Sequence, residues 1–213
     1  MIQTWAANIE PLMQEACYEK YYLQAPKRRQ EKADRLKQMK KKAQSIGVWS
    51  VYAQMRQVYQ LDETAVFNFS HSGSYVLCSV SVDGEKNDAQ ILLGCDVEKV
   101  RAVNLNIAKH FFCESEYQYI VGERNEEQQK ELFYRYWVLK ESFMKATRKG
   151  MAMEMNSFEI RLGNPSVFLH KPEEFSVPFY YMETELGGGA YRVAVCSTDA
   201  EIEPDIRVIQ LGL

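Results

Sequence analysis

The stretch ILLGCDVEKV, residues 91–100, sets an apolar run directly before two carboxylates. A short apolar run of this kind favours a buried strand. Because alternate residues of a strand share a face, Asp96 and Glu98 are predicted to point the same way, with backbone positions roughly 7 Å apart. Like charges this close at the end of a buried strand repel unless a cation or a hydrogen-bond donor offsets them. The sequence therefore predicts a positive group beside this pair.

The size and composition of the chain bound its class. A chain of 213 residues can form one large domain or two small ones. Its hydrophobic content of 46% suffices for a packed core, which excludes a disordered chain. The sequence opens with neither a basic leader nor an apolar segment, and no run is long enough to span a membrane. Five cysteines without a C-x-x-C pair fit reduced thiols. We therefore expect a cytoplasmic protein without membrane contact.

Positive charge is concentrated in one segment. KRRQEKADRLKQMKKK, residues 27–42, is strongly basic, although the whole chain has a net charge of −3. A basic run in an acidic chain indicates a localised anion-binding site. A solvated helix face is the alternative interpretation, and this segment alone does not decide between the two.

Apolar periodicity predicts one strand, a helical region and two further strands in the first part of the chain. The expected elements are a strand at 1–7, helical residues 9–59 interrupted near Pro26, and strands at 65–70 and 74–82. The polar stretch 83–90, with a turn signal at Asp83-Gly84, is the expected boundary between two halves.

The second part of the chain repeats this order. The expected elements are a strand at 91–99, helical residues 104–147 interrupted near 121–125, and strands at 157–162, 178–186 and 191–197. Three consecutive glycines, 187–189, indicate a hairpin turn rather than a phosphate-binding loop, because no helix follows them. The repeated order predicts an α+β fold with two similar halves, residues 1–89 and 90–213.

The helical stretch EEQQKELFYRYWVLKESFMKATRKG, residues 126–150, carries a second group of polar side chains. At 100° per residue Glu141 lies opposite the centre of the apolar stripe, with Trp137 one turn before it and Lys145 one turn after it. The members of that stripe are Leu132, Tyr136, Leu139, Phe143 and Ala146. A Glu–Lys pair at this spacing is common on helix surfaces. The large apolar neighbours of Glu141 favour a position in a cleft over one on an exposed helix surface.

Two carboxylates on a strand and a third on a helix could hold one magnesium ion through oxygen ligands. A lysine one turn away and a basic segment suit a polyphosphate substrate. His71, in a loop after a strand, can donate to phosphate, although a lone histidine in such a loop is more often structural. The sequence contains no Walker-type GxxxxGK[ST], GxSxG or HExxH motif.

Three blocks, FNFSHSGSY, GCDVEKV and WVLKESFMKATRKG, resemble in order and spacing the signature blocks of the 4′-phosphopantetheinyl transferases. The likeness is greater to the two-domain, surfactin-synthetase-activating type. It covers most of residues 66–197 and, more loosely, the basic segment. The resemblance implies two α+β halves related by a pseudo-twofold axis, with coenzyme A in the cleft between them.

The implied reaction moves the 4′-phosphopantetheine arm of coenzyme A to a serine of an acyl, peptidyl or aryl carrier protein and releases adenosine 3′,5′-bisphosphate. By this resemblance the magnesium ligands are Asp96, Glu98 and Glu141. Glu141 also matches the base for the carrier serine, and Lys145 matches the lysine that stabilises the leaving group.

The resemblance also assigns residues to the binding of coenzyme A. Trp137 and Lys140 match positions that shape the cleft, and Ser70 and His71 match a pair near the coenzyme phosphates. In the basic segment Lys32 and Arg29 match cations that hold the 3′-phosphate. Ser45 lies near the position of a small hydroxyl residue.

One departure concerns the grip on the coenzyme. The family's Gly-Lys-Pro block, shortly before the SHSG strand, has no counterpart in QVYQLDETAVFNFSHSG, so its lysine is missing. Val138 and Cys95 also differ from the residues that are usual in the family at these positions, but neither difference removes a metal ligand.

Other functions remain open from the residues alone. A magnesium-dependent phosphohydrolase could use the same carboxylates, and a non-catalytic module could grip nucleic acid with its basic helix. The acidic remainder of the chain disfavours nucleic acid as a partner. A monomer is the expected state, and the carrier could belong to fatty-acid, polyketide or nonribosomal-peptide synthesis.

Overall fold

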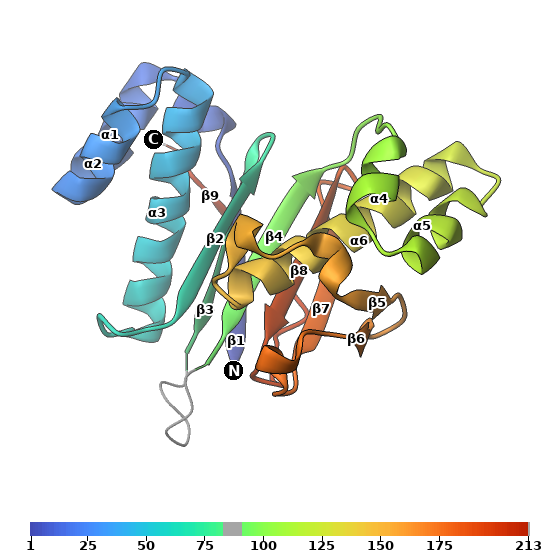
Figure 1. Ribbon diagram of the computed structural model, residues 1–213. Helices are drawn as coiled ribbons and strands as arrows, with labels where there is room; N and C mark the ends of the chain where they lie inside the picture. The colour runs from blue at the N-terminus through green and yellow to red at the C-terminus, as the bar shows by residue number, and fades with distance from the viewer. Residues whose placement is uncertain (83–90, 213) are drawn as a thin grey trace.

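The computed structural model describes residues 1–82 and 91–212 (Figure 1). The first part of the chain forms β1 (Ile2–Asn8), the 3-10 turn η1 (Glu10–Met13), α1 (Glu15–Gln24), α2 (Lys27–Asp34), α3 (Met39–Tyr59), β2 (Phe67–Ser72) and β3 (Tyr75–Ser81). Pro26 precedes α2, where its fixed backbone angle suits the start of a helix. The predicted interruption of the helical region near this proline is therefore confirmed.

The second part forms β4 (Leu93–Lys99), α4 (Asn106–Phe111), α5 (Glu114–Val121), α6 (Glu126–Ala146), the 3-10 turns η2 (Gly150–Ala152), η3 (Met155–Ser157) and η4 (Glu173–Phe175), and the strands β5 (Glu159–Arg161), β6 (Val167–His170), β7 (Tyr180–Leu186), β8 (Tyr191–Ser197) and β9 (Arg207–Gln210). Asn125 caps α6 by accepting hydrogen bonds from the amides of Glu127 and Gln128. This cap explains the predicted break at 121–125.

The two sheets repeat one arrangement. The first has the strand order β2-β3-β1-β9 and the second the order β4-β8-β7. In each, the opening strand pairs antiparallel with the third, which pairs with the second, and a helix of 21 residues (α3 or α6) precedes that hairpin. The predicted α+β fold with two similar halves is confirmed.

The C-terminal strand β9 lies parallel to β1, so the end of the chain completes the first sheet. The predicted boundary stretch 83–90 and its Asp83-Gly84 turn lie outside the described residues. The division into residues 1–89 and 90–213 therefore stays a prediction.

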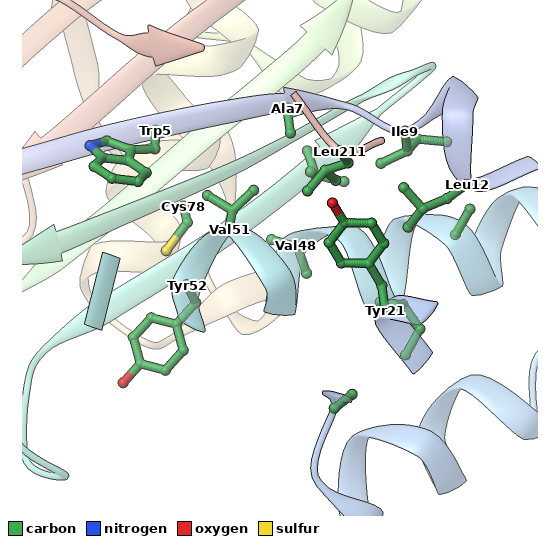
Figure 2. Packing of buried hydrophobic residues seen from close by; sticks show 14 of the residues in the cluster. Trp5, Ala7, Ile9, Leu12, Tyr21, Val48, Val51, Tyr52, Cys78 and Leu211 are labelled. Atoms are coloured by element: carbon green, nitrogen blue, oxygen red, sulfur yellow. The ribbon is translucent and has the colours of Figure 1, made fainter. Parts of the chain in front are cut away.

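Each long helix covers one sheet, and the two sheets pack face to face. α3 buries its apolar side on the first sheet, and Figure 2 shows Val48 and Val51 between this helix and the strands that carry Ala7 and Cys78. α6 covers the second sheet in the same way. The faces of the two sheets that point away from the long helices form a third buried apolar cluster. Ala6 is a member of this cluster from the first sheet. Every residue of β1 and β4 except Lys99 is buried or partly buried, so each strand is covered on both faces over most of its length.

The predicted hairpin at residues 187–189 is confirmed. All three glycines have positive φ angles, of 62°, 64° and 88°, between β7 and β8. Two strands, β6 and β9, were not predicted, because each has four residues and an exposed face without a long apolar run. Within the described part of the chain, no helix combines the length and apolar character that a membrane span requires.

Candidate active site

The candidate site lies where an edge of the first sheet meets an edge of the second. β2 and β4 belong to different sheets, yet side chains of β2 bond to the backbone of β4. Asn68 Oδ1 accepts a hydrogen bond from the amide of Cys95 (3.1 Å), and Ser70 Oγ accepts one from the amide of Val97 (3.2 Å). Ser72 Oγ accepts a third, from the amide of Lys99 (3.1 Å). We call Asn68, Ser70 and Ser72 the side-chain ladder.

The same serines hold the two strand carboxylates. Ser70 Oγ donates to Asp96 Oδ1 at 2.8 Å, and Ser72 Oγ donates to Glu98 Oε2 at 2.6 Å. Each hydroxyl thus donates to a carboxylate while it accepts from the amide one residue further along β4. Because alternate residues of both strands face each other, Asp96 and Glu98 point to the same side, as the sequence predicted.

The predicted positive group is Lys145 of α6. Its Nζ lies 2.6 Å from Asp96 Oδ1, 3.1 Å from Ser70 Oγ and 3.2 Å from the carbonyl oxygen of Cys95. Burial lowers the pKa of Lys145, but the charges of Asp96 and Cys95 and the hydrogen bond to Asp96 outweigh it and raise that pKa above its usual value. The lysine therefore stays charged beside a carboxylate.

A glycine brings α6 this close to β4. A Cβ atom at Gly94 would lie 2.0 Å from the carbonyl oxygen of Ser142 and 2.4 Å from the amide nitrogen of Ala146. Contacts of this kind leave no room for any side chain. Gly94 therefore lets Lys145 reach Asp96, two residues along the strand.

Glu141, one turn before Lys145, belongs to the same electrostatic group. Burial, and then the charge of Asp96, raises the pKa of Glu141, with a smaller contribution from Glu98. Burial raises the pKa of Glu98 as well, and the hydrogen bond from Ser72 partly opposes that increase. Three carboxylates that repel one another and lose contact with water form a site that favours a cation.

The donor set fits a hard cation such as Mg²⁺. All three groups offer carboxylate oxygens, and Asp96 Oδ2 is buried with no hydrogen-bond partner among the described residues. Over residues 1–82 and 91–212, however, no three His, Cys, Asp or Glu side chains are already gathered closely enough to hold a metal ion. The carboxylates would have to move together to ligate one ion.

His71 lies within β2 rather than in a loop after the strand, where the sequence predicted it. Burial lowers the pKa of this histidine, and the charges of Lys145, Lys32 and Lys41 lower it further. The structure thus brings predicted phosphate-binding residues from α2, β2 and α6 into one electrostatic neighbourhood. Ser45, at the start of α3, is buried, and its Oγ has no hydrogen-bond partner in the part of the chain that is described.

Arg29 belongs to α2 and contacts the side chain of Phe69 on β2. Its guanidinium carbon lies 5.2 Å from the ring centre of Trp49 and 5.6 Å from that of Phe69. The arginine is half-buried against aromatic rings rather than paired with a carboxylate.

Lys140 occupies a different environment from the other predicted residues. The side chain is 0% exposed, and its Nζ lies 2.9 Å from Glu116 Oε2, 2.8 Å from the carbonyl oxygen of Met155 and 2.7 Å from that of Phe158. Glu116 in turn accepts from the backbone amides of Cys113 and Ile160. This network gives Lys140 a structural role between α5, α6 and β5, and its place in a coenzyme-binding cleft stays a prediction.

Trp137 stacks on Phe133 at a ring-centre distance of 5.5 Å. It also lines an apolar cavity of about 340 Å³ together with Phe111 and Met144, and Glu141 contributes to the same wall. The tryptophan therefore flanks the candidate site, as its position on the helix predicted.

Three residues that support the site were not assigned from the sequence. Asn68 and Ser72 alternate with Ser70 along β2, and this alternation is a signal that could have identified them. Glu116 lies in the first turn of α5 next to Ser115 and close to Glu114, so its burial had no local signal.

The chain is similar to known proteins of one family. Residues 92–196 match the family model of the 4′-phosphopantetheinyl transferase superfamily. The chain is 35% identical over 146 residues to the 4′-phosphopantetheinyl transferase Sfp of Bacillus subtilis (strain 168), covering 68% of this chain and 60% of that relative. It is 32% identical over 131 residues to the 4′-phosphopantetheinyl transferase gsp of Aneurinibacillus migulanus, covering 62% of this chain and 52% of that protein.

Among solved structures, the chain is similar to the crystal structure of Thermotoga maritima holo-[acyl-carrier-protein] synthase (AcpS), with 23% identity and a TM-score of 0.42 over 51% of this chain and 63% of that chain. The chain spans 60% of the length of the first of the curated relatives it matches. This chain belongs to the 4′-phosphopantetheinyl transferase superfamily.

Proposed function

We propose that this protein transfers the 4′-phosphopantetheine group of coenzyme A to a serine of an acyl or peptidyl carrier protein and releases adenosine 3′,5′-bisphosphate. The observation that carries the proposal is the bonded group Ser70–Asp96–Lys145, with Glu98 and Glu141 in electrostatic contact. The carboxylates and Lys145 lie within residues 92–196, which match the family model. The relatives named above are themselves 4′-phosphopantetheinyl transferases.

Asp96, Glu98 and Glu141 would hold the magnesium ion of this reaction. The unpartnered Asp96 Oδ2 and the mutual repulsion of the carboxylates support this assignment. When bound, the ion would supply positive charge to the pyrophosphate of coenzyme A.

Glu141 and Lys145 would perform the proton and charge chemistry. Glu141 is partly exposed and borders the apolar cavity, so its carboxylate can accept the proton of a carrier serine that approaches from solvent. Lys145 would stabilise the negative charge that develops on the leaving phosphate. In the free protein Asp96 keeps this ammonium group in place.

The other predicted residues would bind the two ends of coenzyme A. Lys32, Arg29 and Ser45 would contact the 3′-phosphate, and the electrostatic influence of Lys32 on His71 supports a shared anion site. Ser70 and His71 would lie beside the pyrophosphate. The cavity lined by Trp137 suits the weakly polar pantetheine arm.

Intact-mass analysis of a carrier protein tests the proposal. The full chain, coenzyme A and Mg²⁺ are incubated with carriers from fatty-acid, polyketide and nonribosomal-peptide synthesis, each with a serine-to-alanine version as control. We expect a mass gain of one phosphopantetheine group on at least one carrier, and no gain on its alanine version.

Two outcomes would contradict the proposal in favour of the alternatives. Cleavage of coenzyme A without a mass gain on any carrier would indicate a phosphohydrolase. Salt-dependent binding of DNA or RNA without transfer would indicate a nucleic-acid-binding module. The cytoplasmic location and monomeric state expected from the sequence stay predictions.

A further inference from the structure

The turn that joins β2 to β3, residues 73–74, directly follows the side-chain ladder. Ser72, the residue before it, makes the last bond of the ladder and holds Glu98 Oε2 at 2.6 Å. Gly73 has a φ angle of +56°, a conformation that residues with a side chain rarely adopt. The place of this turn therefore determines where the hydroxyl group of Ser72 lies relative to β4.

A tyrosine of the second sheet contacts this turn. Tyr191, the first residue of β8, is 5% exposed, and its Oη accepts a hydrogen bond of 3.0 Å from the amide of Ser74. Its ring meets that of Tyr75 edge-on, with the ring centres 4.8 Å apart. Tyr191 also lies opposite Lys99 in the pairing of β8 with β4. One side chain therefore connects the turn of the first sheet with the neighbour of the strand that carries two predicted metal ligands.

The turn packs against this tyrosine without spare room. A Cβ atom at Gly73 would lie 2.5 Å from Oη of Tyr191, and 3.0 Å from both Cε1 of Tyr191 and Cδ of Lys99. Separations this short leave no space for a side chain. Because the turn fits closely between Tyr191 and Lys99, a shift of the tyrosine is passed on to the turn.

Contacts within the first part of the chain hold the other side of the turn. Gln44 on α3 donates to the carbonyl oxygen of Gly73 at 3.0 Å. The amide of Ile9 donates to the carbonyl oxygen of Ser74 at 2.8 Å. The turn is thus bonded to α3 and the end of β1 on one side and to β8 on the other, which fixes its place between the sheets.

We propose that Tyr191 is a positioning residue: its hydroxyl group holds the turn after Ser72, and through Ser72 it orients Glu98 for the metal ion. The inference rests on the proposed function, which supplies the ion and the transfer reaction. Tyr191 is buried in the apolar cluster between the sheets, so it acts through Ser72 and not by contact with a substrate.

Tyr191→Phe tests the proposal, because it keeps the ring and removes the acceptor of the Ser74 amide. Calorimetry on the full chain should show a Mg²⁺ dissociation constant roughly 3- to 10-fold higher, below the roughly 10- to 100-fold typical of residues bonded directly to a metal ligand. In the metal-free protein, hydrogen exchange of the Ser74 amide should be faster, since that amide loses its partner. Unchanged Mg²⁺ affinity would overturn the proposal.

Tyr21→Phe is the matched control. Tyr21, on α1, is 9% exposed, and its hydroxyl group donates to the carbonyl oxygen of Gly212 at 3.1 Å. Both variants should lower the urea midpoint of unfolding by similar amounts, but only Tyr191→Phe should change Mg²⁺ affinity. An equal change of affinity in both variants would mean that lost stability accounts for it, and would overturn the positioning role.

A combination with Ser72→Ala tests the route of the effect. If Tyr191 acts through Ser72, adding Tyr191→Phe to Ser72→Ala should cause little further loss of Mg²⁺ affinity, because the connection to Glu98 is already broken. Losses that add in full would overturn this route.

The same variants separate this inference from the proposed function. Weaker Mg²⁺ binding by Tyr191→Phe, in a chain that modifies no carrier, would support the positioning role and contradict the transferase activity. Wild-type Mg²⁺ affinity together with wild-type transfer by Tyr191→Phe would contradict the positioning role and leave the activity standing. Where both hold, excess Mg²⁺ should return kcat of the variant to near the wild-type value, because no ligand has been removed.

Discussion

Ser72 Oγ donates a hydrogen bond of 2.6 Å to Glu98 Oε2 and accepts one of 3.1 Å from the amide of Lys99. This one hydroxyl therefore joins the edges of two sheets and fixes the rotamer of a predicted metal ligand. Ser70 makes the corresponding pair of bonds with Asp96 and Val97. The site depends on contacts between the halves as much as on the carboxylates themselves.

Removing the Ser72 hydroxyl should disturb both stability and metal binding. Ser72→Ala leaves the amide of Lys99 without its acceptor and should lower the free energy of unfolding by roughly 1–3 kcal/mol. Mg²⁺ affinity, measured by calorimetry, should fall several-fold because Glu98 loses its orientation. Ser72→Thr keeps the hydroxyl and should restore much of both.

Ser115→Ala is a matched control for this experiment, because Ser115 Oγ donates to Glu159 in an exposed bond of 2.5 Å. It should change stability less and Mg²⁺ affinity not at all. A Ser72→Ala protein that binds Mg²⁺ like wild type would show that the hydroxyl does not position Glu98.

Asp96 and Lys145 should be strongly coupled in a double-mutant cycle. The pair joins side chains that are only 4% and 27% exposed, so either single variant leaves a charge with little contact to water. For Asp96→Asn and Lys145→Met we expect a coupling free energy of roughly 1–3 kcal/mol from urea denaturation. The exposed pair Lys149–Glu174, at 3.2 Å, is the control and should show coupling near zero. Equal coupling in both pairs would contradict the described burial.

Gly94→Ala should separate α6 from β4. The new Cβ would meet backbone atoms of Ser142 and Ala146, which cannot rotate away. We expect a loss of roughly 1–3 kcal/mol or more of unfolding free energy, together with weaker transfer, because Lys145 and Glu141 move with the helix. Gly188→Ala is no control because of its positive φ, but Gly212→Ala should be neutral, because no atom of the described residues beyond its chain neighbours lies within 4 Å of the new Cβ. A stable, active Gly94→Ala protein would mean that the helix does not approach the strand this closely.

The buried Lys140–Glu116 pair should matter for stability first. Lys140→Met leaves Glu116 uncompensated in an apolar environment and should cost roughly 3–5 kcal/mol in thermal or chemical unfolding. Burial lowers the pKa of Lys140, and the charge of Glu116 opposes that decrease. The double variant Lys140→Met/Glu116→Gln should recover part of the loss. If Lys140→Met unfolds like wild type but binds coenzyme A poorly, Lys140 contacts the ligand instead.

The periodicity of strands and helices was enough to predict most of the candidate site from the sequence. Alternation along β4 put Asp96 and Glu98 on one side, and helical spacing put Trp137, Glu141 and Lys145 on neighbouring turns. Their meeting follows from Gly94, whose lack of a side chain has meaning only after α6 has packed on β4.

Contacts between distant segments could not be predicted in the same way. The side-chain ladder requires the edge of one sheet to meet the edge of another, and nothing in either strand specifies that partner. β9 pairs with β1 from the other end of the chain, and its four mostly exposed residues carry no strong period.

Single-turnover transfer by Glu141→Gln tests the central claim most directly. The variant keeps the shape of the side chain but loses its charge and most of its basicity. With a carrier that wild type modifies, the rate of mass gain should fall roughly 10²- to 10⁴-fold if proton acceptance dominates. If metal ligation dominates, excess Mg²⁺ should restore much of the rate. Glu174→Gln, at an exposed position, should react like wild type. Full activity of Glu141→Gln at low Mg²⁺ would contradict both roles, and with them the assignment of this cleft as the active site.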